Sequence, residues 1–159
     1  MRHASASDLE FIAESFVKIP RFMQSGETDA YIAALPTQVD DSIRELASHY
    51  ICDDDRIALV VESEGQLIAC LLGEIRQPSL TAANLGDVGF ISICWVEPQF
   101  RNSGCAAKLV SEAEEWFCSR GIELLEVSYM AKNETAANVW QQLGFEPFRV
   151  SAYKSLTDD

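Results

Sequence analysis

The segment between Val88 and Phe117 constrains the fold more than any other part of the sequence. Val88 to Val96 is a run of mostly apolar residues closed by Pro98, which predicts a long buried strand. Apolar residues then recur at helical spacing up to Phe117, so an amphipathic helix follows after a short turn. A further strand is predicted over 122–129. A strand–helix–strand unit of this kind forms a right-handed crossover with parallel strands.

The rest of the chain supplies further helices and strands, with no internal repeat or linker. The first helix is expected to begin near Ser7 or Asp8, with Pro20 just beyond its end. A tight turn at Glu64-Gly65 joins two strands into an antiparallel hairpin. The other predicted elements are helices over 28–50, interrupted at Pro36, and over 133–143, and strands over 57–61, 66–72 and 145–153. The fold class is therefore α/β (α+β), with a mixed sheet flanked by helices.

Length and charge narrow the classes of function. The chain has 159 residues, which predicts a single domain over 1–159. Twelve Lys and Arg stand against 25 Asp and Glu, a net charge of −13. This charge disfavours nucleic acid and anionic membranes as partners and favours a cationic partner, although solubility alone explains it equally well.

The cysteines and the apolar runs indicate in which cellular compartment the protein is expected. The five cysteines share no ligand spacing with the two histidines, so we expect reduced thiols, a cytoplasmic protein and no metal site. We expect neither a signal peptide nor a membrane-spanning helix, because the apolar runs are too short.

The turn before the helix has the features of an anion-binding site. Gly104 has no side chain to keep an anion away from the backbone, and Ala106 is small as well. The helix N-terminus offers unpaired N–H groups and the positive end of its dipole, and Arg101 adds a full charge. A glycine that only allows tight packing is the alternative interpretation. Neither the Gly-Lys-Ser/Thr of a nucleotide P-loop nor a three-glycine dinucleotide fingerprint is present.

Two blocks of sequence follow one another along the chain. The first is Val96-x-Pro98-x-x-Arg101-x-x-Gly104-x-Ala106, and the second comprises Asn133-x-x-Ala136, Trp140 and Gly144-Phe145. In this order they resemble the GNAT superfamily of N-acetyltransferases. The opening Arg2-x-Ala4-x-x-x-Asp8 is also similar to the start of that family. The resemblance covers most of the chain and is strongest over 88–146. It implies six or seven strands with about four helices, and central parallel strands that splay to admit acetyl-CoA.

The resemblance also implies roles for single residues. The pyrophosphate of acetyl-CoA would be held by the backbone N–H groups of Asn102, Ser103, Gly104, Cys105 and Ala106, with Arg101 alongside. The pantetheine arm would pair with the backbone of Cys94, Trp95 and Val96. Asn133 would bind that arm, and the same residue type is also a good helix N-cap.

The acid and base of the transfer are less evident from the sequence. Trp140 stands where the family often has a tyrosine that protonates the leaving thiolate, and an indole N–H is not a practical acid. Trp140 is therefore interpreted mainly as packing, with a hydrogen bond to the sulfur as the alternative. Water, Tyr129 or Tyr153 are substitutes by chemical type only.

A carboxylate near the strand ends could take the proton from the amine, directly or through water. Glu74 and Asp87 are the candidates, each with the alternative of a solvated carboxylate. Strict alternation along the strand would put Phe90, Ser92 and Cys94 on one face. Cys94 is interpreted as a core residue rather than a nucleophile, because no histidine is paired with it in the sequence.

The acceptor site is expected from residues 1–55 and the loop 77–86. Phe22, Tyr31, Tyr50 and the run Asp53-Asp54-Asp55 are candidates to line a pocket for a cationic amine, and an ordinary helix face with an acidic loop is the alternative. The leading hypothesis is transfer of acetyl from acetyl-CoA to a primary amine of a small molecule, peptide or protein. A noncatalytic acyl-CoA-binding module and an unrelated anion-binding α/β protein are the alternatives. A homodimer is a family-level expectation.

Overall fold

The computed structural model describes residues 1–24, 30–80, 82, 84–154 and 156. It divides into two compact units, Met1–Ser128 and Tyr129–Asp159. The first unit carries the sheet and most of the helices. The second contains one helix and the C-terminal segment. The single domain expected over 1–159 therefore stays a prediction.

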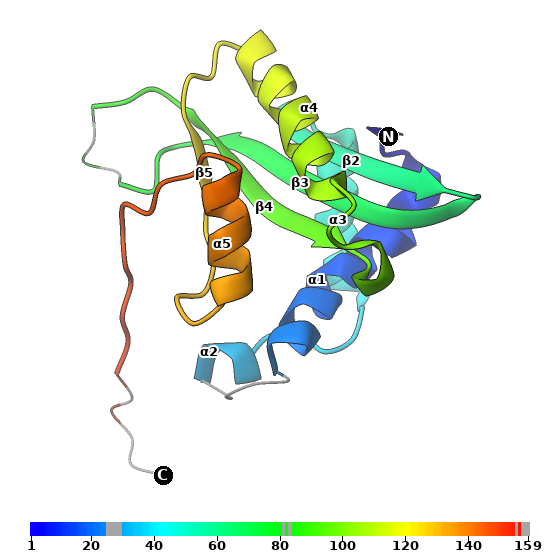
Figure 1. The fold of residues 1–159 in the computed structure, drawn as a ribbon, viewed down its shortest axis with the longest axis horizontal. Coiled ribbons are helices and arrows are strands. Elements are labelled where there is room, and N and C mark those ends of the chain that lie inside the picture. Colours follow the sequence, from blue (N-terminus) through cyan, green and yellow to red (C-terminus); the bar gives the residue numbers. More distant parts are fainter. Residues whose placement is uncertain (25–29, 81, 83, 155, 157–159) are drawn as a thin grey trace. The chain divides into compact units, whose positions relative to one another are not determined.

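The first unit is built on a mixed sheet whose spatial order follows the chain, β1-β2-β3-β4-β5 (Figure 1). The strands are β1 Arg2–His3, β2 Arg56–Ser63, β3 Gln66–Arg76, β4 Val88–Val96 and β5 Leu125–Val127. Neighbouring strands are antiparallel up to β4, and β4 pairs with β5 in parallel. The predicted mixed sheet, its hairpin and the parallel crossover are confirmed. The described residues contain five strands rather than six or seven.

Helices cover both faces of this sheet. The helical segments of the first unit are η1 Ala6–Asp8, α1 Leu9–Gln24, α2 Ala30–Ala33, α3 Asp41–Cys52, η2 Pro98–Phe100 and α4 Cys105–Ser119. Helices α1 and α3 bury Ile12, Val17 and Ala47 against side chains of β2, β3 and β4. Helix α4 lies on the opposite face, in front of the strands in Figure 1. The predicted start of the second helical region near Thr28 lies outside the described residues.

Phe117 of α4 sets how closely that helix approaches the sheet. A Cβ on Gly73 would lie 3.0 Å from the Phe117 ring, and one on Gly89 would lie 2.8 Å from it. The ring therefore occupies the space that side chains would take at these two strand positions. Because Phe117 is buried, its packing fixes α4, and with it the turn that precedes α4, against β3 and β4.

A β-bulge at Ser92 interrupts the regular pairing of β4. Leu72 pairs with Ile93 and the next residue, Gly73, pairs with Ile91, so Ser92 has no partner in β3. Gly89, and hence Ile91, faces α4, whereas Ile93 packs into the α1/α3 core. The prediction that Phe90, Ser92 and Cys94 share one face is therefore wrong, because the extra residue moves Cys94 to the α4 face.

Two sequence-based element boundaries are also wrong. Pro20 lies inside α1 rather than beyond it. The apolar face of α1 continues past the proline, and Phe22 still packs edge-on against Trp95 of β4, with 6.4 Å between ring centroids. The predicted strand over 145–153 is not formed, because strands need partners and the described part of the second unit contains no other strand.

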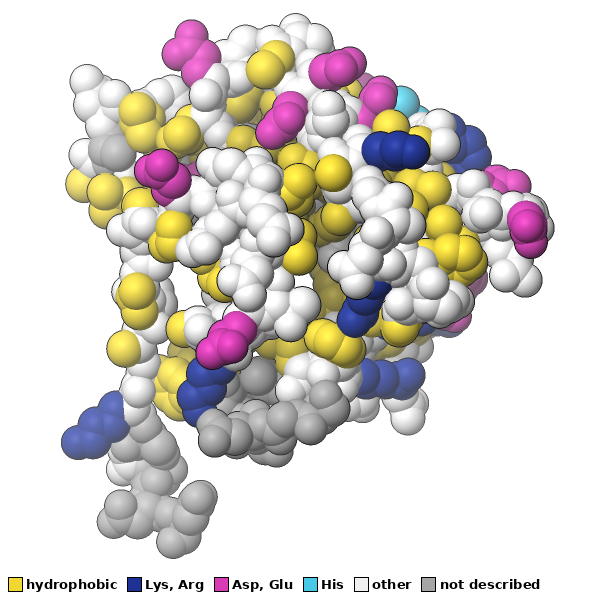
Figure 2. All heavy atoms as spheres, viewed as in Figure 1, with side chains coloured by type: hydrophobic (Ala, Val, Ile, Leu, Met, Phe, Trp, Pro, Cys, Tyr) yellow, Lys and Arg dark blue, Asp and Glu magenta, His cyan; other side chains and the backbone are white. Residues whose placement is uncertain are grey.

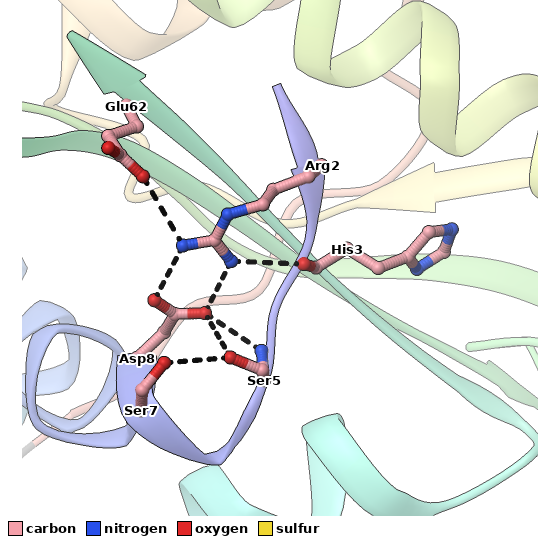
Figure 3. Close-up of polar contacts among 6 residues, drawn as sticks. All are labelled: Arg2, His3, Ser5, Ser7, Asp8 and Glu62. Carbon is pink, nitrogen blue, oxygen red and sulfur yellow. Dashed lines mark hydrogen bonds and ion pairs between the residues drawn. The ribbon is translucent and has the colours of Figure 1, made fainter. Parts of the chain in front are cut away.

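The N-terminal segment is fastened to the start of α1 by one carboxylate (Figure 3). Arg2 donates two hydrogen bonds to Asp8, of 2.6 and 2.9 Å, and the Ser5 backbone N–H donates a third of 2.8 Å. Glu62 of β2 lies 3.5 Å from the same guanidinium. The hydrogen bonds from Arg2 lower the pKa of Asp8 to about 2. Asp8 thereby joins the edge strand β1 to the first helical turn.

The surface carries both signs of charge. Figure 2 shows acidic and basic side chains scattered over the visible face, with no continuous basic patch among the described residues there. None of the described helices is long and apolar enough to cross a membrane.

Asp8→Asn is expected to remove a pH-dependent part of the stability. A carboxylate whose pKa falls on folding stabilises the protein above its ordinary pKa of 3.8, and this stabilisation is lost as the pH falls toward about 2. Wild-type protein should therefore lose stability more steeply than Asp8→Asn over this range. Denaturant midpoints at several pH values measure it, with the exposed Asp41→Asn as the control. Parallel curves for wild type and Asp8→Asn would contradict the assignment.

Candidate functional site

The start of α4 presents backbone N–H groups to open space. Gly104 is its N-cap, with φ of 81°, and among the described residues no side chain caps the helix. The first intrahelical bond of this turn runs from the Lys108 N–H to the Gly104 carbonyl, so the preceding N–H groups of the helix have no partner within it. A Cβ built on Gly104 meets no atom within 4 Å. A helix end of this kind is suited to an anion, and the binding of one here stays a prediction.

The strand that leads into this turn has an open edge. β5 pairs only with Gly89–Ile91 of β4, and in the described part of the chain no strand pairs with residues 92–96 on that side. The Glu97 N–H binds the Ile68 carbonyl of β3 at 2.9 Å, so the backbone groups of Val96 and Cys94 point the other way, toward the open edge. β5 ends at Val127, so its parallel pairing with β4, beyond which the splay is predicted, stops at Ile91.

Arg101 closes the turn onto the end of β4. Its Nε donates a hydrogen bond of 3.2 Å to the Val96 carbonyl. Its guanidinium lies over the ring of Phe22 at 4.3 Å and over that of Trp95 at 5.1 Å. The structure thus gives Arg101 a holding role within the turn. Contact with a pyrophosphate stays a prediction.

Glu97 connects the same turn to α1. Its Oε1 accepts hydrogen bonds from Lys18 Nζ at 2.8 Å and from Trp95 Nε1 at 3.2 Å. Burial alone would raise the pKa of Glu97, but these hydrogen bonds outweigh burial and hold it below its ordinary value. The Glu97 carbonyl also accepts from the Phe100 N–H at 2.8 Å. The turn before α4 is therefore held by a charged pair that the sequence analysis did not find.

A polar cluster lies on the other face of β4, at the bulge. We use this term for Tyr50, Arg56, Glu74, Arg76 and Ser92. The Tyr50 hydroxyl donates to Ser92 Oγ at 2.8 Å, and burial raises the pKa of Tyr50, so the hydroxyl stays protonated. The Arg56 guanidinium lies 5.0 Å from the Tyr50 ring, and its Nε is 3.6 Å from Glu74. The bulge thus places a serine hydroxyl among ionised groups.

A cavity of about 530 Å³ adjoins this cluster. Its described lining consists of Cys52, Asp53, Asp54, Asp55, Arg56, Glu74 and Ile75. The acidic run therefore lines a pocket, as one interpretation of the sequence had it. Phe22, Tyr31 and Tyr50 are not among the described residues that line it.

The predicted catalytic side chains lie in different places. Glu74 is on β3, with its side chain 22% exposed, and pairs in register with Phe90 of β4. Asp87 is exposed before β4 and accepts a hydrogen bond from Gln77. Cys94 is a poor nucleophile, because burial raises the pKa of its thiol to about 12.

Glu126 of β5 is a functional candidate that the sequence analysis missed. It is buried and accepts hydrogen bonds from the backbone and hydroxyl of Ser79, and Arg76 lies 3.9 Å away. The signal was a carboxylate between two apolar residues in a predicted strand. No group of three described His, Cys, Asp or Glu residues is arranged to hold a metal ion.

The second sequence block belongs to the second unit. Asn133 caps α5, Glu134–Gln142, and its Oδ1 accepts from the Ala136 N–H at 3.0 Å. Trp140 is 8% exposed and packs edge-on against Phe145, with 5.2 Å between ring centroids. The capping role of Asn133 and the packing role of Trp140 are therefore confirmed. Tyr153 of this unit is exposed, and its part in catalysis stays a prediction.

Comparison with known proteins identifies relatives of this chain. The model of the Acetyltransferase (GNAT) family matches residues 22–145, so the resemblance found in the two blocks is confirmed. Aminoglycoside N(6')-acetyltransferase type 1 of Salmonella typhimurium is 23% identical over 111 residues, which cover 70% of this chain and 77% of that protein.

Solved structures share the fold. Aminoglycoside 6'-N-acetyltransferase AAC(6')-IG of Acinetobacter haemolyticus matches with a TM-score of 0.72 and 22% identity, over 99% of this chain and 98% of that one. AAC(6')-Iy, solved with the bisubstrate analogue CoA-S-monomethyl-acetylneamine, matches with a TM-score of 0.75 and 20% identity, over 98% and 97%.

Lys18→Met is expected to weaken binding of CoA without contacting it. The substitution leaves the partly buried Glu97 carboxylate without its cation, and Glu97 holds the turn before α4. We expect the dissociation constant for CoA, measured by isothermal titration, to rise about fivefold, because such a pair is worth on the order of 1 kcal/mol. Lys18→Arg, which keeps the charge, is the control. An unchanged dissociation constant in Lys18→Met would show that the turn before α4 keeps its conformation without the Lys18–Glu97 pair.

Proposed function

Because this chain belongs to the Acetyltransferase (GNAT) family, and is thus an N-acetyltransferase that takes its acetyl group from acetyl-CoA, we propose that its acceptor is a small molecule bearing several amines. The acidic cavity is the observation that carries this proposal. Asp53, Asp54, Asp55 and Glu74 line it together with one cation, Arg56. Four carboxylates against one guanidinium create a negative potential that attracts a polycation. The net charge of −13 acts in the same direction.

The relatives support the same substrate class. The Salmonella typhimurium protein is named for acetylation of aminoglycosides, and the analogue bound to AAC(6')-Iy joins CoA to an acetylated neamine. Both names describe small polyamines. At 23% and 20% identity, however, the cavity of this chain rather than the relatives' names has to define the acceptor.

In the proposed complex, the turn and the open edge of β4 bind acetyl-CoA. The N–H groups of residues 102–106 would bind the pyrophosphate, since they lie at an uncapped helix start with open space at Gly104. The backbone groups of Cys94 and Val96, which face away from β3, would pair with the amides of the pantetheine arm. The family resemblance also implies contacts from Asn133 and Trp140, which belong to the second unit.

In the proposed reaction, an amine nitrogen attacks the acetyl carbon directly. The new C–N bond forms as the thioester C–S bond breaks, and the departing sulfur takes up a proton. The amine has to lose a proton first, and Glu74 is the proposed base, directly or through water, because it lines the cavity and lies in the cluster at the bulge. Asp87 is the second candidate for this role, and Tyr153 or water is proposed as the acid.

A panel of acceptors tests the proposed function. Purified enzyme is incubated with acetyl-CoA and, separately, neamine, spermine, a peptide with a free N-terminus and a lysine peptide, and products are read by mass spectrometry. The proposal expects repeated turnover with at least one of the small polyamines and far slower turnover with the peptides. Preference for a peptide would overturn it. Binding of acetyl-CoA without turnover of any acceptor would instead favour the noncatalytic module.

Gly104→Glu is expected to abolish acetyl-CoA binding, because it adds bulk and negative charge where the pyrophosphate is proposed to lie. Gly121→Glu is a matched control at the other end of α4. Both glycines have a positive φ, 81° and 76°, and neither has an atom within 4 Å of a built Cβ. Both variants therefore carry the same backbone strain. Isothermal titration should show lost binding in Gly104→Glu and retained binding in Gly121→Glu. Equal losses of acetyl-CoA binding in both variants would refute the proposed position of the pyrophosphate at Gly104.

A further inference from the structure

The polar cluster contains two hydrogen-bond donors that the protein does not use. Arg56 Nη1 and Arg76 Nε are both buried, and neither has a hydrogen-bond partner among the described residues. A buried guanidinium N–H without a partner costs free energy, so such a group normally has a ligand or an ordered water molecule opposite it.

Both arginines lie on the face of the sheet that carries Glu74. Arg56 pairs directly with Glu74 across β2 and β3, and Arg76 follows Glu74 by two residues on β3, so the three side chains share one face. The Arg56 guanidinium lies 5.0 Å from the centroid of the Tyr50 ring, and Arg56 Nε lies 3.6 Å from Glu74. The Tyr50 hydroxyl binds Ser92 at the bulge, where the open part of β4 begins.

The other contacts of each arginine hold it in place. Arg56 Nε lies 3.6 Å from Asp53 and 3.6 Å from Glu74, and the side chain lines the acidic cavity. The Arg76 guanidinium lies 3.4 Å from the centroid of the Phe90 ring. Its Nη2 donates to Ser79 Oγ at 3.0 Å. Each guanidinium is thus oriented by a carboxylate or a ring while one buried N–H group has no hydrogen-bond partner among the described residues. Arg56 is among the described residues that line the cavity, and Arg76 lies beyond them on the same face of the sheet.

The charge around the arginines decides which acceptor atom fits. An anionic ligand would meet the carboxylates of Asp53, Asp54, Asp55 and Glu74, which outnumber the two arginines. A neutral oxygen avoids that repulsion and can accept from a guanidinium N–H. Ammonium groups, in turn, are attracted by the carboxylates.

We propose that Arg56 and Arg76 recognise hydroxyl oxygens of the acceptor, so that the enzyme selects hydroxylated polyamines, such as amino sugars, over linear polyamines. This inference rests on the proposed function and narrows its substrate class. In it, the carboxylates of the cavity bind the ammonium groups, and the two unused N–H groups bind hydroxyls beside the reacting amine. Arg56 and Arg76 are then specificity-determining residues.

The test compares neamine with spermine. The two carry the same number of amines, but only neamine has hydroxyl groups. The variants are Arg56→Met, Arg76→Met and Arg56→Lys. Arg44→Met, at a half-buried position of α3 away from the cluster, is the control. For each, kcat/KM is measured for both acceptors, and the dissociation constant for acetyl-CoA is measured by isothermal titration.

Opposite shifts for the two acceptors are the expected result. Arg56→Met should lower kcat/KM for neamine about tenfold, the loss of one hydrogen bond to a charged donor. The same change makes the cavity more negative, so kcat/KM for spermine should stay constant or rise. Arg76→Met should act in the same way, and Arg56→Lys should recover only part of the neamine rate because it lacks the planar donor geometry. Arg44→Met should leave kcat/KM unchanged for both acceptors.

A variant that fails to fold or to bind the cofactor would lose kcat/KM for both acceptors together. The acetyl-CoA titration identifies such a variant. Equal losses for neamine and spermine with unchanged acetyl-CoA binding would overturn the inference while leaving the proposed function intact. Wild-type preference for spermine would overturn it as well. Absence of turnover with every small polyamine would overturn both the inference and the proposed function.

Discussion

The pairing of β4 with β5 stops at Ile91, and the rest of the site depends on this limit. Beyond it, the peptide groups of Cys94 and Val96 face away from β3, and the described part of the sheet supplies them with no partner strand. Backbone donors and acceptors have to be satisfied by some partner, so an unpaired strand edge readily binds an extended ligand. The pantetheine arm of acetyl-CoA, with its amides, is a ligand of that kind. The next N–H groups along the chain are those at the start of α4, where they meet open space rather than a side-chain cap.

The two faces of β4 have separate tasks. On one face, Phe117 fills the space over Gly73 and Gly89 and fixes α4, and therefore the turn before α4. On the other face, the bulge at Ser92 brings a hydroxyl to Tyr50 of α3, next to Arg56 and Glu74. A regular strand would keep strict alternation and lose this arrangement. In the proposed complex, the donor side and the acceptor side of the reaction are thus built from opposite faces of one strand. Glu97 and Lys18 tie the turn before α4 to α1.

Features with a local cause could be predicted from the sequence. β4 has its predicted bounds, Val88–Val96, because a long apolar run is closed by a proline. The positive φ of Gly104 and the capping role of Asn133 follow from residue type and position. Features with a distant cause could not be predicted. The bulge at Ser92 depends on registration against β3. Pro20 lies inside α1, and Val17 and Phe22 on either side of it pack against the sheet. Arg56 and Arg76 gave no sequence signal, because their unused N–H groups result from burial.

Amide hydrogen exchange with and without CoA, resolved to single residues by NMR, tests the central claim most directly. If the open edge and the helix start bind the cofactor, CoA should slow exchange at the amides of Cys94 and Val96 and at residues 102–106. The amide of Glu97, already bound to Ile68, should change least in this segment. Protection confined to other parts of the chain, or protection at α4 without any at Cys94 and Val96, would contradict the account of β4 as the pantetheine-binding strand.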